Sequence, residues 1–139
     1  MSHILHRHSK LKLPQIAGGE GPYLFDSTGK RYLDACGGAA VSCLGHSNAH
    51  VKAAIKKQID EIPYAHTSFF TSEVAEQLAE KLIADAPSNM GKVYFVTGGS
   101  EANESALKLA RQYFVEIDEP QRKYFIAREQ SYHGNTVMT

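Results

Sequence analysis

Apolar residues recur every three or four positions in two stretches of the chain, the spacing that places them on one face of a helix. The first stretch predicts a helix that begins near residue 48, with residue 47 or 48 as its N-cap, and ends at Pro63. The second predicts a helix from residue 71 or 72 to the break at Pro87. The apolar positions are Val51, Ile55, Ile59 and Ile62 in the first stretch, and Val74, Leu78 and Leu82 in the second.

Two short runs farther along the chain are continuously apolar, as expected of strands that are buried on both faces of a parallel sheet. They are residues 93–96 and 124–127, and residues 101–114 between them carry a helical pattern. Strand, helix and strand in this order predict a βαβ unit with parallel strands and a right-handed connection. Because two parallel strands do not make a finished sheet, we expect the sequence to be the beginning of a larger α/β fold.

The start of the chain predicts a β-hairpin that follows a surface arm. Residues 23–25 and 31–33 favour strands, and the loop between them contains Gly29, where a positive φ is expected. Residues 1–21 are rich in His, Lys and Gly, which suits an arm on a surface better than a core element. Their three histidines match no standard metal-ligand spacing, so the arm is favoured over a metal site.

Composition excludes several classes of protein. The chain has 139 residues, of which 42% are hydrophobic and 22% charged, so we expect it to fold and to be soluble. Lys plus Arg and Asp plus Glu both number 15, which gives no general attraction for nucleic acid or anionic lipid. No transmembrane run or secretion signal is visible, so a cytoplasmic location with reduced cysteines is expected.

A glycine-rich segment between the first apolar run and the following helix predicts an anion site. It reads Gly98-Gly99-Ser100-Glu101, at a place where free backbone N–H groups and the helix dipole favour a phosphate. The segment matches neither the nucleotide-binding P-loop nor the dinucleotide fingerprint, so a single phosphate monoester is the expected ligand. A plain strand-to-helix turn with Ser100 as helix cap is equally compatible with this spacing.

The turn after the second apolar run contains Tyr132, His133 and Gly134. Ligands of open α/β sheets gather at the carboxyl ends of the strands, so both loops are expected to open on the same edge. An aromatic ring beside a phosphate site suggests stacking of Tyr132 on a planar cofactor. Taken alone, this triplet fits a capping tyrosine in a loop better.

Taken together, these motifs resemble, in order and spacing, the N-terminal third of class III aminotransferases. The likeness covers nearly all of residues 18–139, and its most specific part is the glycine-rich segment paired with the later Tyr-His-Gly turn. The motifs are Tyr32-Leu33-Asp34-Ala35-Cys36-Gly37-Gly38, Leu44-Gly45-His46, Gly99-Ser100-Glu101-Ala102-Asn103-Glu104 with Leu107-Lys108-Leu109-Ala110-Arg111, and Ser131-Tyr132-His133-Gly134.

The resemblance implies a dimeric pyridoxal-phosphate enzyme of fold type I that moves an amino group from an amine or amino acid to a keto acid. It implies that Gly99 and Ser100 bind the cofactor phosphate and that Tyr132 stacks on its ring. It also implies an arm at residues 1–21, an N-terminal small-domain segment with hairpin and helix at 22–66, and the truncated beginning of the large cofactor-binding domain, with its first βαβ unit, at 67–139.

The family's Schiff-base lysine lies beyond this sequence, and so does the aspartate that pairs with the pyridine nitrogen. No catalytic residue is therefore expected here, and the 139-residue portion alone is expected to be inactive. One alternative is a non-catalytic phospho-ligand-binding α/β module, which would need a closed core of its own. Another is an assembly fragment whose open sheet edge must be covered by the remainder of a longer chain.

Overall fold

The computed structural model describes residues 3–8, 10–137 and 139. Contacts divide the chain into two compact units, Met1–Phe70 and Thr71–Thr139. No helix in the described part of the chain is long and apolar enough to cross a bilayer. The domain limits that we expect at residues 21 and 66 stay predictions.

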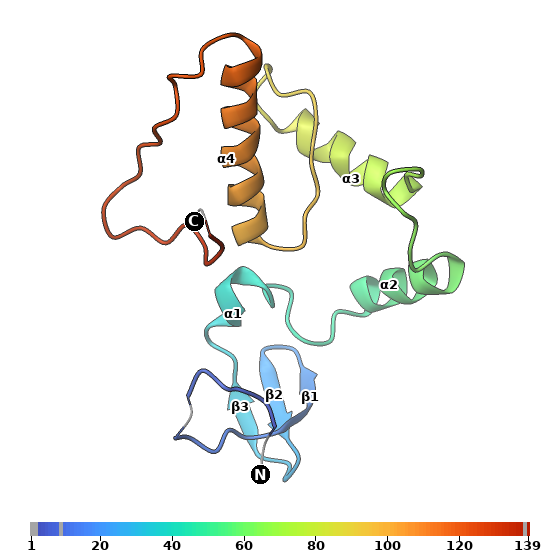
Figure 1. Cartoon of the computed structure of the whole chain (residues 1–139). Coiled ribbons are helices and arrows are strands. Elements are labelled where there is room, and N and C mark those ends of the chain that lie inside the picture. Colours follow the sequence, from blue (N-terminus) through green and yellow to red (C-terminus); the bar gives the residue numbers. More distant parts are fainter. Residues whose placement is uncertain (1–2, 9, 138) are drawn as a thin grey trace. The chain divides into compact units, whose positions relative to one another are not determined.

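The first unit contains a three-stranded antiparallel sheet in the order β1-β2-β3 (Figure 1). Strands β2 (Tyr23–Asp26) and β3 (Arg31–Leu33) form the predicted hairpin, with Gly29 in its loop at a φ of 84°. Asp26, which is only 9% exposed, organises the loop: its carboxylate accepts hydrogen bonds from the Thr28 hydroxyl (2.7 Å) and the Tyr32 hydroxyl (2.8 Å). These bonds hold the pKa of Asp26 down to about 2.

Strand β1 (Ile16–Glu20) lies within the segment that the sequence predicts as an arm. It pairs with β2, from Glu20 opposite Tyr23 to Ile16 opposite Asp26, with an irregularity between Ile16 and Gly18. Its sequence contains two adjacent glycines, which have poor strand propensity. The pattern of apolar and polar residues therefore did not predict a strand here. Pairing across the sheet, which periodicity does not report, makes these five residues a strand.

Two helices follow the sheet in the first unit. Helix α1 (Gly37–Ala40) is a single turn in which Gly37, Gly38 and Ala40 have φ values of 59°, 57° and 68°. Helix α2 (Ala49–Glu61) confirms the first predicted helix. The side chain of Asn48 accepts a hydrogen bond from the Val51 N–H (3.1 Å), so Asn48 is the N-cap.

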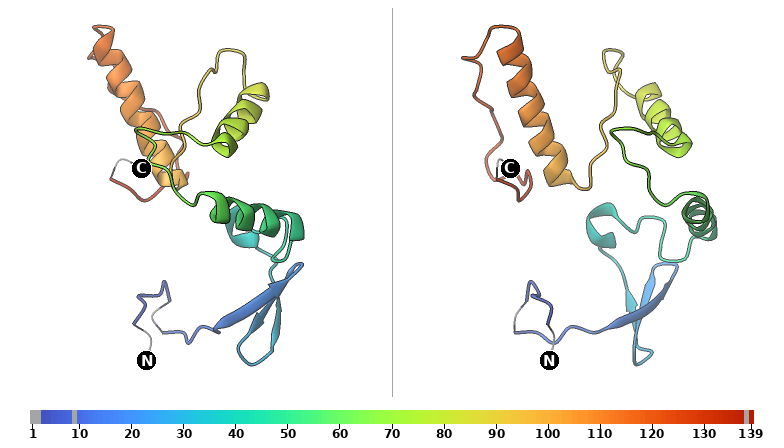
Figure 2. Two further views of the ribbon diagram at one scale, coloured as in Figure 1. Left: turned by 90° about the vertical axis from the view of Figure 1, so that its right-hand side faces the viewer. Right: turned by 45° about the vertical axis from the view of Figure 1, so that its right-hand side comes forward.

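The described residues of the second unit form two helices joined by an irregular segment (Figure 2). Helix α3 (Glu73–Ala84) begins after Ser72 and confirms the second predicted helix. Helix α4 (Gly99–Glu116) confirms the third and extends two residues beyond each end of the predicted range 101–114. Its first residue is Gly99, so the glycine-rich segment forms the start of the helix itself.

The two predicted parallel strands, residues 93–96 and 124–127, are not strands in this structure, and the expectation that they are buried is wrong for this chain. Tyr94 is 80% exposed and Ile126 is fully exposed, and no apolar side chain in the described residues is buried. A strand exists only through hydrogen bonds to a neighbouring strand, and neither run has one within the described chain. The predicted βαβ unit is therefore present as its helix and two unpaired segments.

Candidate functional site

Helix α4 presents unpaired backbone donors at its N-terminus. Its first intrahelical bond runs from the Ala102 N–H to the Gly98 carbonyl (3.0 Å), so the N–H groups of Gly99, Ser100 and Glu101 precede the hydrogen-bonding pattern. The helix has 18 residues, long enough for its dipole to place partial positive charge at this end. These donors and this charge are suited to an anion.

Space is open in front of Gly99. A Cβ atom built on Gly99 would have no atom within 4 Å apart from its chain neighbours and the backbone of its own helix, and the residue does not have a positive φ. Packing within the described chain therefore gives no reason for a glycine at position 99. Gly98 differs, because a Cβ there would lie 2.6 Å from a carboxylate oxygen of Glu101. The open side of the helix start is the Gly99 side.

Ser100 is not the cap of α4, so the alternative expectation that it caps this helix is wrong. The N-cap is Gly98, without a side-chain cap bond, and Ser100 lies inside the first turn. Its hydroxyl donates to the Asn135 side-chain oxygen (2.9 Å) and accepts from the Asn135 backbone N–H (3.1 Å). The hydroxyl is therefore engaged with the turn at residues 132–136, and the backbone N–H of Ser100 is the group that faces no partner in the helix.

The turn at residues 132–136 is held against the start of α4, as expected from the two motifs. Asn103 donates from its side-chain amide to the His133 carbonyl (2.6 Å), in addition to the Ser100–Asn135 bonds. Gly134 approaches so closely that a Cβ would lie 2.8 Å from the Ser100 hydroxyl oxygen. The two motifs therefore meet in space although the sheet edge that was expected to bring them together is not formed.

Tyr132 lies two residues before Gly134, on the same turn, and its side chain is 83% exposed. No ring contact to Tyr132 is found in the described residues, so the ring is open to a planar ligand. The sequence predicts cofactor contacts for Gly99, Ser100 and Tyr132, which stay predictions, and it assigns no role to Asn103 or Asn135. The signal for Asn135 was its place after a glycine in a turn, whereas Asn103 had no signal beyond the resembling motif.

Glu104 adds a further contact between α4 and this turn. Hydrogen bonds from Lys108 and Thr136 lower the pKa of Glu104 below its usual range, the Lys108 bond being the stronger cause. The Lys108 ammonium lies 2.7 Å from the Glu104 carboxylate. Ser100, Asn103 and Glu104 therefore all reach the turn from one face of α4, since residues three and four apart are neighbours on a helix.

A second polar cluster, to which the sequence analysis assigned no role, surrounds Asp34 in the first unit. Its carboxylate accepts hydrogen bonds from the Ser42 hydroxyl (2.8 Å), the Gly37 N–H (3.0 Å) and the Cys36 thiol (3.4 Å), and His46 lies against it. The Ser42 and Gly37 bonds are the main causes that hold the pKa of Asp34 down to about 2. The cluster lines a hollow of about 510 Å³.

The Asp34 cluster has the residue types of a hydrolytic triad but not its geometry. Ser42 and His46 both bond to the same oxygen of Asp34, so His46 is not placed between them as a base for the Ser42 hydroxyl. The arrangement holds the chain around α1 in place. The sequence signals for it were an aspartate shortly before a pair of glycines and the place of Asp34 and His46 in the resembling motifs.

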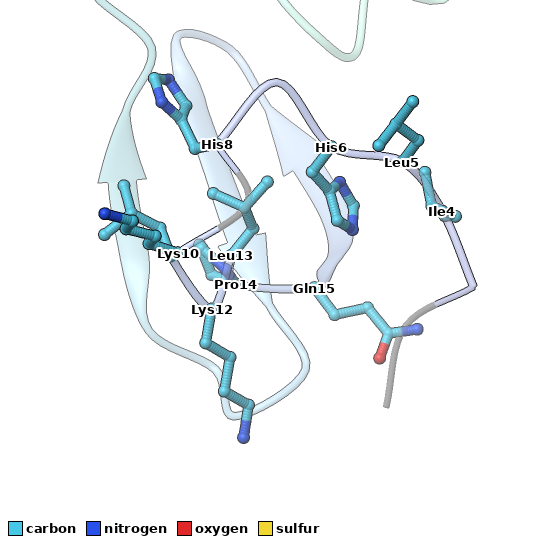
Figure 3. Close-up of a pocket in the computed structure, with 10 residues that line it drawn as sticks. Ile4, Leu5, His6, His8, Lys10, Lys12, Leu13, Pro14 and Gln15 are labelled. Carbon is cyan, nitrogen blue, oxygen red and sulfur yellow. The ribbon is translucent and has the colours of Figure 1, made fainter.

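Another hollow lies along the segment before β1 and has about 900 Å³ (Figure 3). Its lining residues all lie between Ile4 and Gln15 in the sequence and include His6, His8 and Lys10. No group of three or more potential metal ligands occurs in the described parts of the chain. Because the hollow gathers no residues from distant parts of the sequence, we do not regard it as the candidate site.

Comparisons with known proteins identify the family. The family model for class III aminotransferases matches residues 5–139. An uncharacterised aminotransferase of Schizosaccharomyces pombe is 45% identical over 124 residues, which are 89% of this chain and 27% of the relative. The uncharacterised aminotransferase YodT of Bacillus subtilis is 39% identical over 136 residues, which are 98% of this chain and 31% of the relative.

Solved structures that resemble this chain are also transaminases. An omega transaminase of Pseudomonas jessenii, in complex with PMP, aligns with a TM-score of 0.88 at 36% identity and covers 99% of this chain and 31% of its own. This likeness confirms the predicted fold class, the beginning of an α/β transferase of fold type I. The chain spans about a third of the length of the relatives that it matches. On the family match over nearly its whole length, the chain belongs to the class III aminotransferase family.

Proposed function

We propose that this chain supplies the part of a transaminase that holds the phosphate and the ring of pyridoxal phosphate. The transaminase would move an amino group from an amine or amino acid to a keto acid. The observation that carries the proposal is that the turn bearing Tyr132 is bonded to the first two turns of α4, where the phosphate donors lie. Two names support the reaction class: the Pseudomonas jessenii relative contains PMP, and another solved relative is described as a transaminase with L-ala.

The start of α4 fits the phosphate of this cofactor. The N–H groups of Gly99 and Ser100 would donate to phosphate oxygens, and the helix dipole would favour their negative charge. The open space at Gly99 leaves room for the oxygens to approach the backbone, because no side chain of the described residues fills it. The Ser100 hydroxyl would orient the turn rather than the phosphate, because it already donates to and accepts from Asn135.

The exposed ring of Tyr132 fits the planar part of the cofactor. Offset stacking adds roughly 0.5–1.5 kcal/mol beyond burial of the ring. When bound, pyridoxal phosphate supplies the electron sink for moving the amino group. The role of Tyr132 is to hold the ring in one orientation, and that of Gly99 and Ser100 is to hold the phosphate.

The catalytic lysine would come from outside these 139 residues. The chain contains ten lysines, and we assign the covalent role to none of them. Lys108 lies on α4, the helix that begins at the proposed site, and it is 64% exposed and paired with Glu104. A covalent lysine needs a desolvated setting that makes its amine nucleophilic, and Lys108 has none.

The assembly that we propose is a cytoplasmic homodimer of a longer polypeptide without nucleic-acid or membrane partners. The family resemblance supports the dimer, and the equal numbers of acidic and basic residues argue against nucleic acid. Size-exclusion chromatography with light scattering on the longer polypeptide tests the dimer.

The proposed function is tested by replacing Gly99 in the longer polypeptide. Gly99→Val places a branched side chain in the open space, so we expect pyridoxal phosphate to bind about tenfold or more weakly, because a hydrogen bond to a charged group contributes roughly 1.5–3 kcal/mol. Gly91→Val is the matched control, since Gly91 is also exposed, lies in the same unit and has no positive φ. Unchanged cofactor affinity in Gly99→Val would overturn the phosphate assignment.

A further inference from the structure

Three side chains on one face of α4 are bonded to a turn that lies about thirty residues later in the sequence. Ser100 bonds to Asn135, Asn103 bonds to the His133 carbonyl, and Glu104 bonds to Thr136. These three contacts, which we call the α4 clamp, span the turn from His133 to Thr136. The turn is therefore fixed at several points over four residues.

Gly134 shows how closely the clamp draws the turn to the helix. Its φ is 136°, and a Cβ there would lie 3.0 Å from the Ser100 Cα and 2.8 Å from the Ser100 hydroxyl oxygen. Both the backbone conformation and the close approach favour glycine at this position. The turn thus has a defined seat on the helix, in which only a residue without a side chain fits.

Within the clamp, Asn103 acts nearest to Tyr132. Its side-chain amide donates to the carbonyl of His133, the residue that directly follows Tyr132, at 2.6 Å. Ser100 and Glu104 bond farther along the turn, at Asn135 and Thr136. Ser100 also belongs to the proposed phosphate site, and Glu104 also pairs with Lys108, so Asn103 is the member whose side-chain bond goes to the turn alone.

We propose that Asn103 is a positioning residue for the cofactor ring: its bond to the His133 carbonyl sets where the Tyr132 ring stands relative to the N-terminus of α4. This role rests on the proposed function, because the ring that Tyr132 would meet is that of the bound cofactor. We assign Asn103 no direct contact with the cofactor. Asn103 acts through the backbone of His133, the residue that directly follows Tyr132.

The chemistry of the bond selects the variant that tests it. The His133 carbonyl can only accept, so Asn103 must donate, and Asn103→Asp keeps the size of the side chain while replacing the donor by a second acceptor. Gln112→Glu makes the same amide-to-carboxylate change on an exposed position of the same helix, more than two turns away, and serves as the matched control. Asn103→Ala removes the bond without adding charge.

The first measurement does not depend on the cofactor. In the longer polypeptide without pyridoxal phosphate, we expect amide hydrogen exchange at residues 132–135 to be about fivefold faster in Asn103→Asp and Asn103→Ala than in the parent protein, which corresponds to the loss of one hydrogen bond. The control Gln112→Glu should leave this exchange unchanged. Equal exchange in all four proteins would overturn the positioning role.

The second measurement separates positioning of Tyr132 from a general effect on stability. We expect pyridoxal phosphate to leave Asn103→Asp about fivefold faster than the parent protein, with a weaker visible circular-dichroism band of the bound cofactor. In a Tyr132→Ala background, the same Asn103→Asp change should no longer alter the release rate, because the residue through which it acts is absent.

Each outcome decides a different claim. If Asn103→Asp speeds release equally with and without the Tyr132 ring, Asn103 does not act through Tyr132 and the proposal is wrong. If the parent polypeptide retains no pyridoxal phosphate, the proposed function fails and this role fails with it. If the parent retains the cofactor but neither exchange nor release changes in the Asn103 variants, only the positioning role is overturned.

Discussion

The imidazole Nε2 of His46 lies 2.9 Å from a carboxylate oxygen of Asp34, twelve residues earlier in the chain. His46 also donates its backbone N–H to the Gly21 carbonyl (2.9 Å), and Gly21 donates its own N–H to the Ser47 hydroxyl (3.0 Å). These contacts connect the chain after β3 back to the turn between β1 and β2. The Asp34–His46 pair therefore joins the loop around α1 to the sheet.

Acid should release this loop, because protonation of Asp34 removes the acceptor that Ser42, Gly37 and His46 share. The folded-state pKa of Asp34 is about 2, below its ordinary value of 3.8, so its contribution to stability is fully present above about pH 4 and is lost as the pH falls through 2. Titration of the Asp34 carboxyl by NMR should give a midpoint near pH 2. A midpoint near its ordinary value would show that these hydrogen bonds are absent in solution.

The Tyr132 ring should matter more than its hydroxyl. In the longer polypeptide, Tyr132→Ala is expected to weaken pyridoxal phosphate binding roughly threefold to tenfold and to slow amino transfer, since stacking uses the ring face. Tyr132→Phe should bind the cofactor nearly as well as the parent protein. If Tyr132→Phe weakened cofactor binding as much as Tyr132→Ala in a titration, the hydroxyl of Tyr132 and not the stacking of its ring would hold the cofactor.

A side chain at position 134 should push the turn at residues 132–136 away from the start of α4. Gly134→Ala would place a methyl group against Ser100 at a φ of 136°, a strain of about 1–3 kcal/mol for a residue other than glycine. We expect faster amide exchange at residues 133–136 and weaker cofactor binding. Gly91→Ala, where a Cβ meets no atom within 4 Å, is the matched control and should leave both measurements unchanged.

The 139-residue chain by itself should show no transaminase activity. The proposed site can bind the phosphate and one face of the ring, so a weak absorption band that washes out is expected, but no lysine of the chain is held for the covalent step. Adding pyridoxal phosphate, reducing with borohydride and mapping the peptides should reveal no single modified lysine. One stoichiometric lysine adduct together with turnover of an amine donor would show that the catalytic lysine had been misplaced.

The helices were predictable because their signals are local. The apolar spacing of α2 and α3 and the Asn48 cap lie within a few residues of the bonds that they predict. The start of α4 was predictable for the same reason, since glycines before a helical pattern mark its N-terminus. The motif pair also predicted that the Tyr132 turn and Ser100 belong to one place.

What required the tertiary structure is every feature that depends on a partner far along the chain. Strand β1 forms because β2 pairs with it, although its own glycines favour no strand. Residues 93–96 and 124–127 have strand-forming sequences but remain unpaired, because a strand needs a neighbour that the described chain does not supply.

The candidate site likewise combines features that the sequence predicts with features that need distant partners. The amino-acid sequence by itself determined which residue types stand at the helix start and in the turn, through their order and spacing. Only the tertiary structure decided that the Ser100 hydroxyl bonds to Asn135 and that the Asn103 amide bonds to the His133 carbonyl. Each hydrogen bond depends on the distance and direction between two atoms, and here the two residues are some thirty positions apart in the sequence.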